Sequence, residues 1–288
     1  MIIVNLSGGL GNQLFQYAFG RFLSEKNNCK LKIDISSYDN YEWHKYSLKP
    51  FYINESFADK NDCDFLKGNN ISFSDKIKRK LSNHNYLCKE LNLSFNTNYK
   101  HIKSPVYLEG YWQSDKYFNE IETIIRNEYK IKLLPSEVNQ QILNKIVNEN
   151  SISLHVRRGN FINIDYVNKI HGTCSSVYYK EAIQLLTSKV INPIFYIFSD
   201  DIEWARNNII INHETIFVDI NDSDNDYEDL RLMYSCKHHI IANSTFSWWG
   251  AWLNQSKDKI VIAPKNWFSD TNMNNQTKEL IPKEWIRL

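Results

Sequence analysis

Two adjacent arginines, Arg157 and Arg158, follow an apolar segment at residues 152–156 and precede Gly159. A guanidinium group carries a rigid fork of N–H donors that matches the oxygens of a phosphate. Open α/β folds bind ligands at the carboxyl ends of parallel strands, so this basic pair is positioned for a phosphorylated ligand. The alternative is a pair of solvated arginines at the end of a surface strand.

Two carboxylates, Asp200 and Asp201, follow a second apolar segment at residues 195–198. A carboxylate at the end of a strand accepts hydrogen bonds from the N–H groups of guanine or from the hydroxyls of a ribose. The alternative is that one of the two aspartates caps the next helix.

A third strand end carries Asn243, Ser244 and Thr245, directly before a helical pattern that begins near Phe246. Free N–H groups and hydroxyls at a helix amino terminus can hold a diphosphate. An N-cap followed by a buried helix is the structural alternative, and both descriptions can hold together. The three strand ends together outline a nucleotide pocket.

Near the amino terminus, a glycine-rich loop contains Gly9, Gly11, Asn12 and Gln13. It follows a short apolar segment and leads into a helical pattern, which is typical of the first βα unit of a nucleotide-binding fold. Glycines let the backbone approach a ligand or another domain closely. The alternative is a tight turn without a ligand.

The second half of the chain predicts alternating strands and helices, and therefore a parallel sheet covered by helices on both faces. The expected strands are 152–156, 194–198, 215–218, 238–241 and 259–262, and the expected helices are 176–188, 201–208, 227–234 and 246–253. In the first half we expect strands at 1–4, 31–34 and from 106, helices at 14–23, 114–129 and 136–148, and short helices and loops over 38–103. The predicted domains are residues 1–149 and 150–288.

The composition excludes several classes of protein. The 288 residues include 34 Lys plus Arg and 33 Asp plus Glu, without the basic excess of a nucleic-acid-binding protein. The five cysteines are scattered without a CxxC pair, which indicates reduced thiols and no zinc site. No apolar stretch approaches the ~18 residues of a membrane span, and residues 1–5 do not resemble a signal peptide. We therefore expect a cytoplasmic protein.

Four segments resemble the alpha-1,2-fucosyltransferases that use GDP-fucose, and they occur in the order expected for that family. They are GGLGNQLFQYA at residues 8–18, HVRRGN at 155–160, FSDD at 198–201 and NSTFSWWGAWLN at 243–254. GYWQSDKYF at residues 110–118 is similar to the bacterial members. The resemblance therefore covers nearly the whole chain.

This resemblance implies an α/β fold of two facing Rossmann-like domains, the GT-B type, with the donor bound by the carboxyl-terminal half and the acceptor by the amino-terminal half. It implies an inverting, metal-independent transfer of L-fucose from GDP-fucose to the 2-hydroxyl of a terminal galactose, in a glycan such as a bacterial O-antigen. No cofactor is expected besides the donor substrate. Asp222 and Asp224 have the spacing of a metal-binding motif, but they lie in a polar loop that we interpret as a solvated turn.

The same resemblance, combined with the chemistry of the transfer, assigns roles to the motif residues. Breaking the bond to fucose leaves negative charge on the β-phosphate, and Arg157 is the first candidate to stabilise it. His155 and Arg158 would support this role. The remaining assignments are donor binding by Asn243, phosphate binding by Ser244, Thr245 and the backbone near Phe246, guanine recognition by Asp200 or Asp201, and closure of the cleft near the sugar by Gly9, Gly11, Asn12 and Gln13.

The chain departs from the family pattern at Asn160, where relatives typically carry an aspartate. An asparagine cannot take a proton from an acceptor hydroxyl, so any general base lies elsewhere. The resemblance points to Asp165 as a candidate, because related alpha-1,6-fucosyltransferases carry an acid at a similar spacing after their HVRR motif. In the alternative, the departing diphosphate itself accepts the proton late in the reaction.

Two other functions fit the same motifs: transfer of a different GDP-sugar or to a different hydroxyl, and non-catalytic binding of a nucleotide sugar or glycan. Peripheral contact with the inner membrane would suit a lipid-linked acceptor, although the sequence shows no amphipathic basic helix that stands out.

Overall fold

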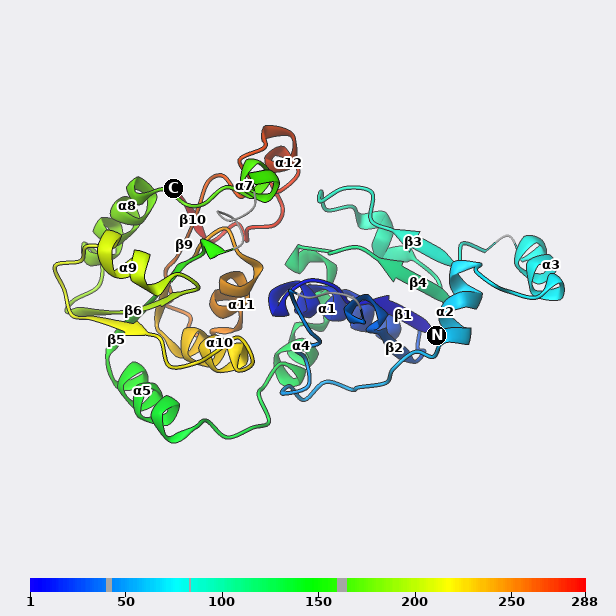
Figure 1. Ribbon diagram of the computed structural model, residues 1–288, viewed down its shortest axis with the longest axis horizontal. Coiled ribbons are helices and arrows are strands. Elements are labelled where there is room, and N and C mark those ends of the chain that lie inside the picture. The colour runs from blue at the N-terminus through cyan, green and yellow to red at the C-terminus, as the bar shows by residue number, and fades with distance from the viewer. Residues whose placement is uncertain (40–42, 83, 160–164) are drawn as a thin grey trace. The chain divides into compact units, whose positions relative to one another are not determined.

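A computed structural model describes residues 1–39, 43–82, 84–159 and 165–288, without the side chains of residues 165–167. The chain forms two compact units, Met1–Lys132 (unit 1) and Leu133–Leu288 (unit 2), coloured from blue to green and from green to red in Figure 1. Helix α5 (Glu137–Asn148), which the sequence analysis placed in the first domain, belongs to unit 2. Its buried Ile146 packs in a core cluster with Tyr196 and Leu232 of that unit.

Unit 1 is built on a four-stranded sheet in the order β2-β1-β4-β3. All of its strand pairs are parallel. Its elements are β1 (Ile2–Asn5), α1 (Leu10–Lys26), β2 (Leu31–Asp34), α2 (Lys60–Lys67), α3 (Phe73–Leu81), β3 (Leu87–Lys89), β4 (Val106–Glu109) and α4 (Glu122–Glu128), with 3-10 turns at 36–38, 97–101, 115–117 and 119–121.

Neighbouring residues of β1 face opposite sides of this sheet, as the alternation of side chains along a strand requires. Val4 lies against α1, where Gly20 allows the helix backbone to approach it closely. Ile3 instead joins a buried cluster with Leu66 of α2 and Tyr107 of β4. Helices therefore cover both faces of the sheet, and its carboxyl edge is left for loops.

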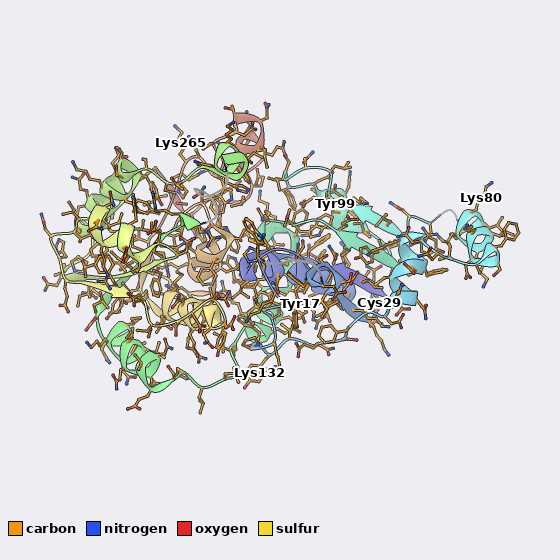
Figure 2. The ribbon with its side chains drawn as sticks, in the orientation of Figure 1. Tyr17, Cys29, Lys80, Tyr99, Lys132 and Lys265 are labelled. Atoms are coloured by element: carbon orange, nitrogen blue, oxygen red, sulfur yellow. The ribbon has the colours of Figure 1, made fainter. Side chains whose placement is uncertain are left out.

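Helix α1 is tied to the rest of unit 1 by polar contacts of its buried side chains. The Tyr17 hydroxyl donates to Glu128 of α4 at 2.8 Å, and the ring of Tyr17 lies 6.0 Å from that of Tyr129. Figure 2 labels Tyr17 within unit 1. The predicted helix over 114–129 is confirmed only in its second half, as α4. Its first half is wrong, because the chain leaves helical geometry at Phe118 (φ −134°), whose buried ring packs near Phe15.

Unit 2 contains a six-stranded parallel sheet in the order β10-β9-β8-β5-β6-β7. After α5 its elements are β5 (Asn150–Val156), α7 (Asp165–His171), α8 (Ser176–Thr187), β6 (Pro193–Ser199), α9 (Ile202–Asn208), β7 (Thr215–Val218), α10 (Asp226–Ser235), β8 (His238–Ile240), α11 (Thr245–Leu253), β9 (Val261–Ala263), α12 (Thr271–Asn275) and β10 (Ile286–Arg287). The predicted parallel sheet is confirmed, whereas α7, α12 and β10 were not predicted.

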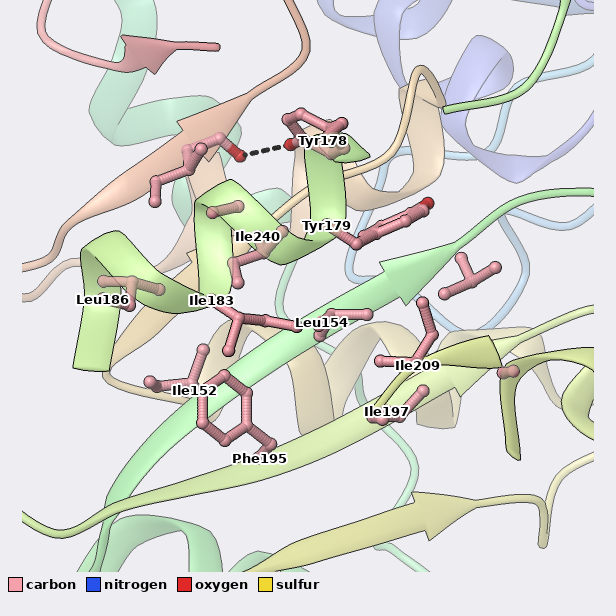
Figure 3. Packing of buried hydrophobic residues seen from close by; sticks show 14 of the residues in the cluster. Ile152, Leu154, Tyr178, Tyr179, Ile183, Leu186, Phe195, Ile197, Ile209 and Ile240 are labelled. Carbon is pink, nitrogen blue, oxygen red and sulfur yellow. Dashed lines mark hydrogen bonds between the residues drawn. The ribbon is translucent and has the colours of Figure 1, made fainter. Parts of the chain in front are cut away.

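The two faces of this sheet are covered by different helices, because the buried strands are apolar on both sides. On one face, Leu154 and Ile197 pack against Tyr179 of α8 and Ile209 beside α9, as Figure 3 shows. The Tyr178 hydroxyl also donates to the Ile262 carbonyl at 3.2 Å. The other face packs against α5 and α10.

The order of the strands places β5 at a topological switch point. The chain continues from β5 to β6 and β7 on one side, and returns to β8, β9 and β10 on the other. Loops that leave neighbouring strands in opposite directions open a crevice at the carboxyl edge of the sheet. The residues after β5, β6 and β8 are therefore the ones that can meet at one site.

Candidate active site

The residues that follow β5 and β6 are joined by an ion pair. Arg157 Nη1 lies 2.7 Å from Asp200 Oδ2, and the other oxygen of that carboxylate accepts the backbone N–H of Arg158 at 2.8 Å. A Cβ atom at Gly159 would overlap the same carboxylate, so any side chain there would displace Asp200 from its pair with Arg157. The side chain of Arg157 is 26% exposed, so solvent reaches part of it at this edge of the sheet.

A second arginine–aspartate pair lies beside the first. Arg158 Nε is 3.2 Å from Asp201 Oδ2, and its guanidinium lies 3.8 Å from the ring centre of Trp204. The other oxygen of Asp201 accepts the Trp204 N–H at 3.1 Å and so caps α9. The capping alternative raised from the sequence is therefore correct for Asp201, whereas Asp200 is used to hold the arginine loop.

His155, the last buried polar residue of β5, lies under this loop. Burial, with a smaller contribution from the charge of Arg157, lowers the pKa of His155 to about 3, so the ring is neutral at physiological pH. Its Nδ1 atom is buried and has no hydrogen-bond partner among the described residues. The ring centre lies 5.8 Å from that of Phe246, which connects β5 to α11.

The side chain of Asn243 makes its hydrogen bonds to neighbouring loops of unit 2. Its amide nitrogen donates to the carbonyls of His171, Gly172 and Trp267 at 3.1–3.2 Å, and its oxygen accepts from the Cys174 thiol at 3.6 Å. A side chain with these four contacts is committed to joining loops. The geometry therefore gives Asn243 a positioning role, and the donor binding predicted for it stays a prediction.

The start of α11 has the geometry expected of a capped helix. The Ser244 hydroxyl accepts the Phe246 N–H at 3.3 Å, and Thr245 is the first helical residue. Behind this first turn, Trp248 and Trp249 are fully buried, and Gly250 packs against Met233 of α10. The tryptophans of this motif thus build the core, while its first turn lies at the same edge as Arg157 and Asp200.

The predicted residues of the glycine loop belong to unit 1, and their polar side chains face the protein. Gln13 is completely buried, donates to the carbonyls of Gly8 and Lys45, and accepts the Ser47 N–H at 2.8 Å. Asn12 Oδ1 accepts from Gln113 at 3.0 Å. Gly9 is the N-cap residue of α1, and Gly11 lies in its first turn. These contacts fix the loop on its own unit.

Unit 1 also has a pocket of about 370 Å³ at the carboxyl edge of its sheet. This volume lies within the range of ~300–1,000 Å³ that small-molecule sites occupy. The lining residues come from the ends of β1, β3 and β4, and include Asn5, Ser7, Lys89, Glu90, Asn92, Glu109 and Tyr111. Amides, a hydroxyl, two carboxylates and an aromatic ring can together bind an uncharged polyhydroxylated ligand.

Among the residues that line this pocket, Glu90 is held by the loop that follows β4. Its carboxylate accepts the N–H of Tyr111 at 2.6 Å and that of Trp112 at 3.1 Å, while burial raises its pKa above the ordinary value. A Cβ atom at Gly110 would overlap the Glu90 side chain, and Trp112 adopts a positive φ of 56°. The loop is thus shaped around the carboxylate. Glu90 was not predicted from the sequence, although GYW after a strand was the available signal.

Three predictions made from the sequence concern the base and the metal. Asn160 and the side chain of Asp165 lie outside the described residues, and the backbone of Asp165 begins α7. Asp222 Oδ1 accepts the Asp224 N–H at 3.0 Å in an exposed turn, as expected. Within the described part of the chain, no three His, Cys, Asp or Glu side chains come together as a metal site. No helix in that part could span a bilayer either.

Solved structures with the same architecture are glycosyltransferases. A mutant of Arabidopsis thaliana FUT1 in complex with GDP has a TM-score of 0.53 at 10% identity, covering 98% of this chain and 75% of that one. Fucosyltransferase NodZ from Bradyrhizobium has a TM-score of 0.51 at 13% identity, covering 88% and 91%. The fold is therefore that of a two-domain, Rossmann-like glycosyltransferase of the GT-B type.

Sequence comparison then identifies the family. Residues 1–288 match glycosyl transferase family 11, and the chain belongs to this family. It is 33% identical to the alpha-1,2-colitosyltransferase of Escherichia coli, over 100% of this chain and 99% of that protein. It is 32% identical to the O-antigen biosynthesis glycosyltransferase WbnK of the same species, over 98% and 99%. A galactoside 2-alpha-L-fucosyltransferase of Bos taurus is 26% identical over 54% of this chain.

Proposed function

We propose that this glycosyltransferase moves L-fucose from GDP-fucose to the 2-hydroxyl of a terminal galactose in a bacterial surface polysaccharide such as an O-antigen. The observation that carries the proposal is the Arg157–Asp200 ion pair at the switch point of the unit 2 sheet, in a chain of family 11. This is the position at which open α/β sheets bind nucleotides.

In this reaction the acceptor oxygen forms a bond to the anomeric carbon as the bond to the β-phosphate oxygen breaks. Negative charge develops on the departing diphosphate, and a fixed guanidinium stabilises that charge more in the transition state than in the ground state. The ion pair with Asp200 holds Arg157 in place, so little reorganisation is needed when the charge appears. The N–H groups at the start of α11, beside Ser244 and Thr245, would bind the other phosphate oxygens.

The proton of the acceptor hydroxyl goes either to Asp165 or to the departing GDP. Asn160 cannot accept a proton, and Asp165 at the start of α7 is our candidate base because it matches the spacing of an acid in the related alpha-1,6-fucosyltransferases. Full activity of an Asp165→Asn variant would eliminate Asp165 and favour proton transfer to GDP. No metal ion is required in this scheme, since Arg157 and the helix amino terminus supply the positive charge.

The acceptor would occupy the pocket of unit 1. Its lining combines a constrained carboxylate, Glu90, with the amides of Asn5 and Asn92 and the partly exposed ring of Tyr111. Such groups bind sugar hydroxyls by hydrogen bonds and a sugar face by contact with the ring. The size of the pocket suits one sugar residue of a larger glycan.

A second donor is favoured by a specific observation. One relative that matches along the whole chain is named a colitosyltransferase, whereas the galactoside fucosyltransferase of Bos taurus matches about half of it. Colitose differs from fucose by lacking the hydroxyl at carbon 3. GDP-colitose is therefore the alternative donor for the same alpha-1,2 transfer.

The test is to incubate the purified protein with GDP-fucose or GDP-colitose, EDTA and a panel of β-galactosides, following GDP release and determining the product linkage by NMR. An alpha-1,2-linked fucosyl product in EDTA is the expected result. Product from GDP-colitose alone would replace the donor but keep the reaction. Tight GDP binding without turnover on either donor would identify a non-catalytic binding protein.

A further inference from the structure

Helix α3 of unit 1 carries its apolar side chains on the outside. Phe73, Ile77 and Leu81 are spaced four residues apart and form one stripe along the helix. Their exposed fractions are 79%, 43% and 80%, the reverse of what a helix packed on a core shows. Figure 1 draws α3 beyond α2 at one end of unit 1, and Figure 2 labels Lys80 there.

The opposite side of α3 attaches the helix to the protein. Arg79 donates to the carbonyls of Phe65 and Leu66, the latter at 3.0 Å. Its guanidinium also lies 4.6 Å from the ring centre of Tyr86. A charged side chain thus makes the inward contacts, and this orientation is what points the apolar stripe outward.

Basic residues border the stripe. Lys76 and Lys80 lie along one edge and Lys78 along the other, as their spacing on a helix requires, and all three are exposed. Asp75 is the one acidic residue of the helix. Its N–H is capped by Ser72, and its carboxylate lies 3.4 Å from Lys78 Nζ, so it offsets part of the charge of Lys78 but not that of Lys76 or Lys80. The exposed face therefore combines apolar side chains with positive charge.

From this arrangement we propose that α3 binds the surface of an anionic lipid bilayer, with Phe73, Ile77 and Leu81 inserted among the acyl chains and the three lysines at the headgroups. Apolar insertion and attraction of Lys to anionic lipid are the two contributions that hold an interfacial helix. Lysine stems reach from beside an inserted stripe back to the headgroups.

The area of the stripe favours a bilayer over a protein partner. A stable protein interface buries about 1,200–2,000 Å² in total, whereas one large aromatic side chain buries about 150–250 Å². Three side chains on a nine-residue helix fall short of that area. A bilayer needs no shape complementarity, and a short stripe bordered by lysines suffices for reversible binding.

The test is flotation of the purified chain with vesicles of phosphatidylcholine alone or mixed with phosphatidylglycerol. We expect binding to the anionic vesicles that weakens as salt is raised. The double variant Phe73→Ser/Leu81→Ser should lower the partition coefficient at least about tenfold, because two inserted side chains are lost. The triple variant Lys76→Glu/Lys78→Glu/Lys80→Glu should abolish the preference for phosphatidylglycerol.

The matched control is Ile191→Ser/Ile210→Ser, which removes two side chains of unit 2 that are 79% and 82% exposed. This control should bind like the original chain, and all variants should keep its melting temperature because the changed residues are exposed. Failure of the original chain to bind anionic vesicles at low salt overturns the proposal. An equal loss in the control pair, or full binding by the Phe73→Ser/Leu81→Ser variant, also overturns it. Turnover on a water-soluble acceptor is read separately, so failure of the proposed transferase activity leaves this test intact.

Discussion

The loops that follow the first strand of each unit differ in where their polar side chains point. In unit 1, Gln13 is completely buried and all of its contacts go to the backbone of its own unit. In unit 2, Arg157 is paired with Asp200 and partly exposed at the carboxyl edge of the sheet. A buried polar group whose hydrogen bonds stay within its own unit supports the structure, whereas a partly exposed charged group at a sheet edge can also contact a ligand.

The same distinction applies within unit 2. Asn243 and Arg157 lie at the carboxyl edge of one sheet, yet the Asn243 side chain is 5% exposed and bonded to three carbonyls. We therefore expect substitutions at the two kinds of position to separate activity from stability. The following predictions test that separation.

The largest effect is expected for Arg157→Ala. Loss of one preorganised donor to developing charge typically lowers turnover about 100- to 1,000-fold. The melting temperature should change little, since the side chain is partly exposed. The measurement is GDP release under saturating donor and acceptor, together with a thermal melt. Arg206→Ala is the matched control, because Arg206 pairs with Asp219 at 3.3 Å on the exposed surface of the same unit. Unchanged turnover in Arg157→Ala would contradict the phosphate role.

Gln13→Ala should lower the stability of the protein, whereas Arg157→Ala should lower its turnover. The change at Gln13 leaves the Ser47 N–H and two carbonyls of unit 1 without their partner, which costs about 2 kcal/mol of stability. Chemical denaturation of unit 1 checks this value, with the exposed Asn119→Ala as the control. If Gln13→Ala keeps its stability but loses turnover, Gln13 contacts the substrate and the comparison between the two loops is wrong.

Glu90→Gln should raise the KM for the acceptor about tenfold, because a hydrogen bond to a charged group contributes roughly 1.5–3 kcal/mol. The KM for the donor should stay the same, since Glu90 belongs to the unit 1 pocket. Initial rates at varied acceptor concentration test this, and exposed Glu120→Gln serves as the control. A rise in the KM for the donor alone would contradict the assignment of Glu90 to acceptor binding.

A smaller effect is expected from pH, through two buried histidines. Burial lowers the pKa of His155 to about 3 and that of His239 well below its ordinary value. An unfolded histidine titrates near pH 6.5, so the unfolded chain binds more protons in the interval below that pH. Stability should be complete above about pH 6.5 and fall on acidification, by about 1 kcal/mol for each histidine between pH 7 and 5.5.

The contribution of His239 to this pH dependence can be tested separately, because both nitrogens of its ring have hydrogen-bond partners. Asn254 Nδ2 donates to His239 Nε2 at 2.8 Å, so the neutral ring carries its proton on Nδ1, next to Ser153. Denaturation at several pH values should show a shallower acid slope in His239→Gln, whereas exposed His213→Gln should keep the slope of the original chain. An unchanged slope in His239→Gln would show that other groups cause the acid loss.

The fold of unit 2 was largely predictable from the sequence. Its strands are apolar runs and its helices begin at polar capping residues, such as Ser175 before α8 and Ser136 before α5. These are local signals that need no knowledge of distant contacts. The segment over 38–103 gave no such signal, and β3 was missed because three residues are too short for a period to appear.

The sequence predicted which residues lie at the carboxyl edge of the unit 2 sheet, but it did not predict which contacts each side chain makes there. The motifs identified Arg157, Asp200 and the start of α11, because strand ends and helix starts can be recognised locally. The sequence did not distinguish Asp200 from Asp201 or show that Asn243 is committed to three carbonyls. Nor did it indicate that Glu90 is enclosed by the loop after β4.

The sequence alone therefore determined the alternation of strands and helices in unit 2 and the residue types at the ends of its strands. Those features depend on neighbours within a few positions along the chain. The tertiary structure decided which polar side chains are consumed by the protein, where the unit 1 pocket lies, and that α3 turns its apolar stripe outward. Each of these depends on partners distant in sequence, such as Arg79 on Phe65 or Gln13 on Lys45, and no local pattern encodes such contacts.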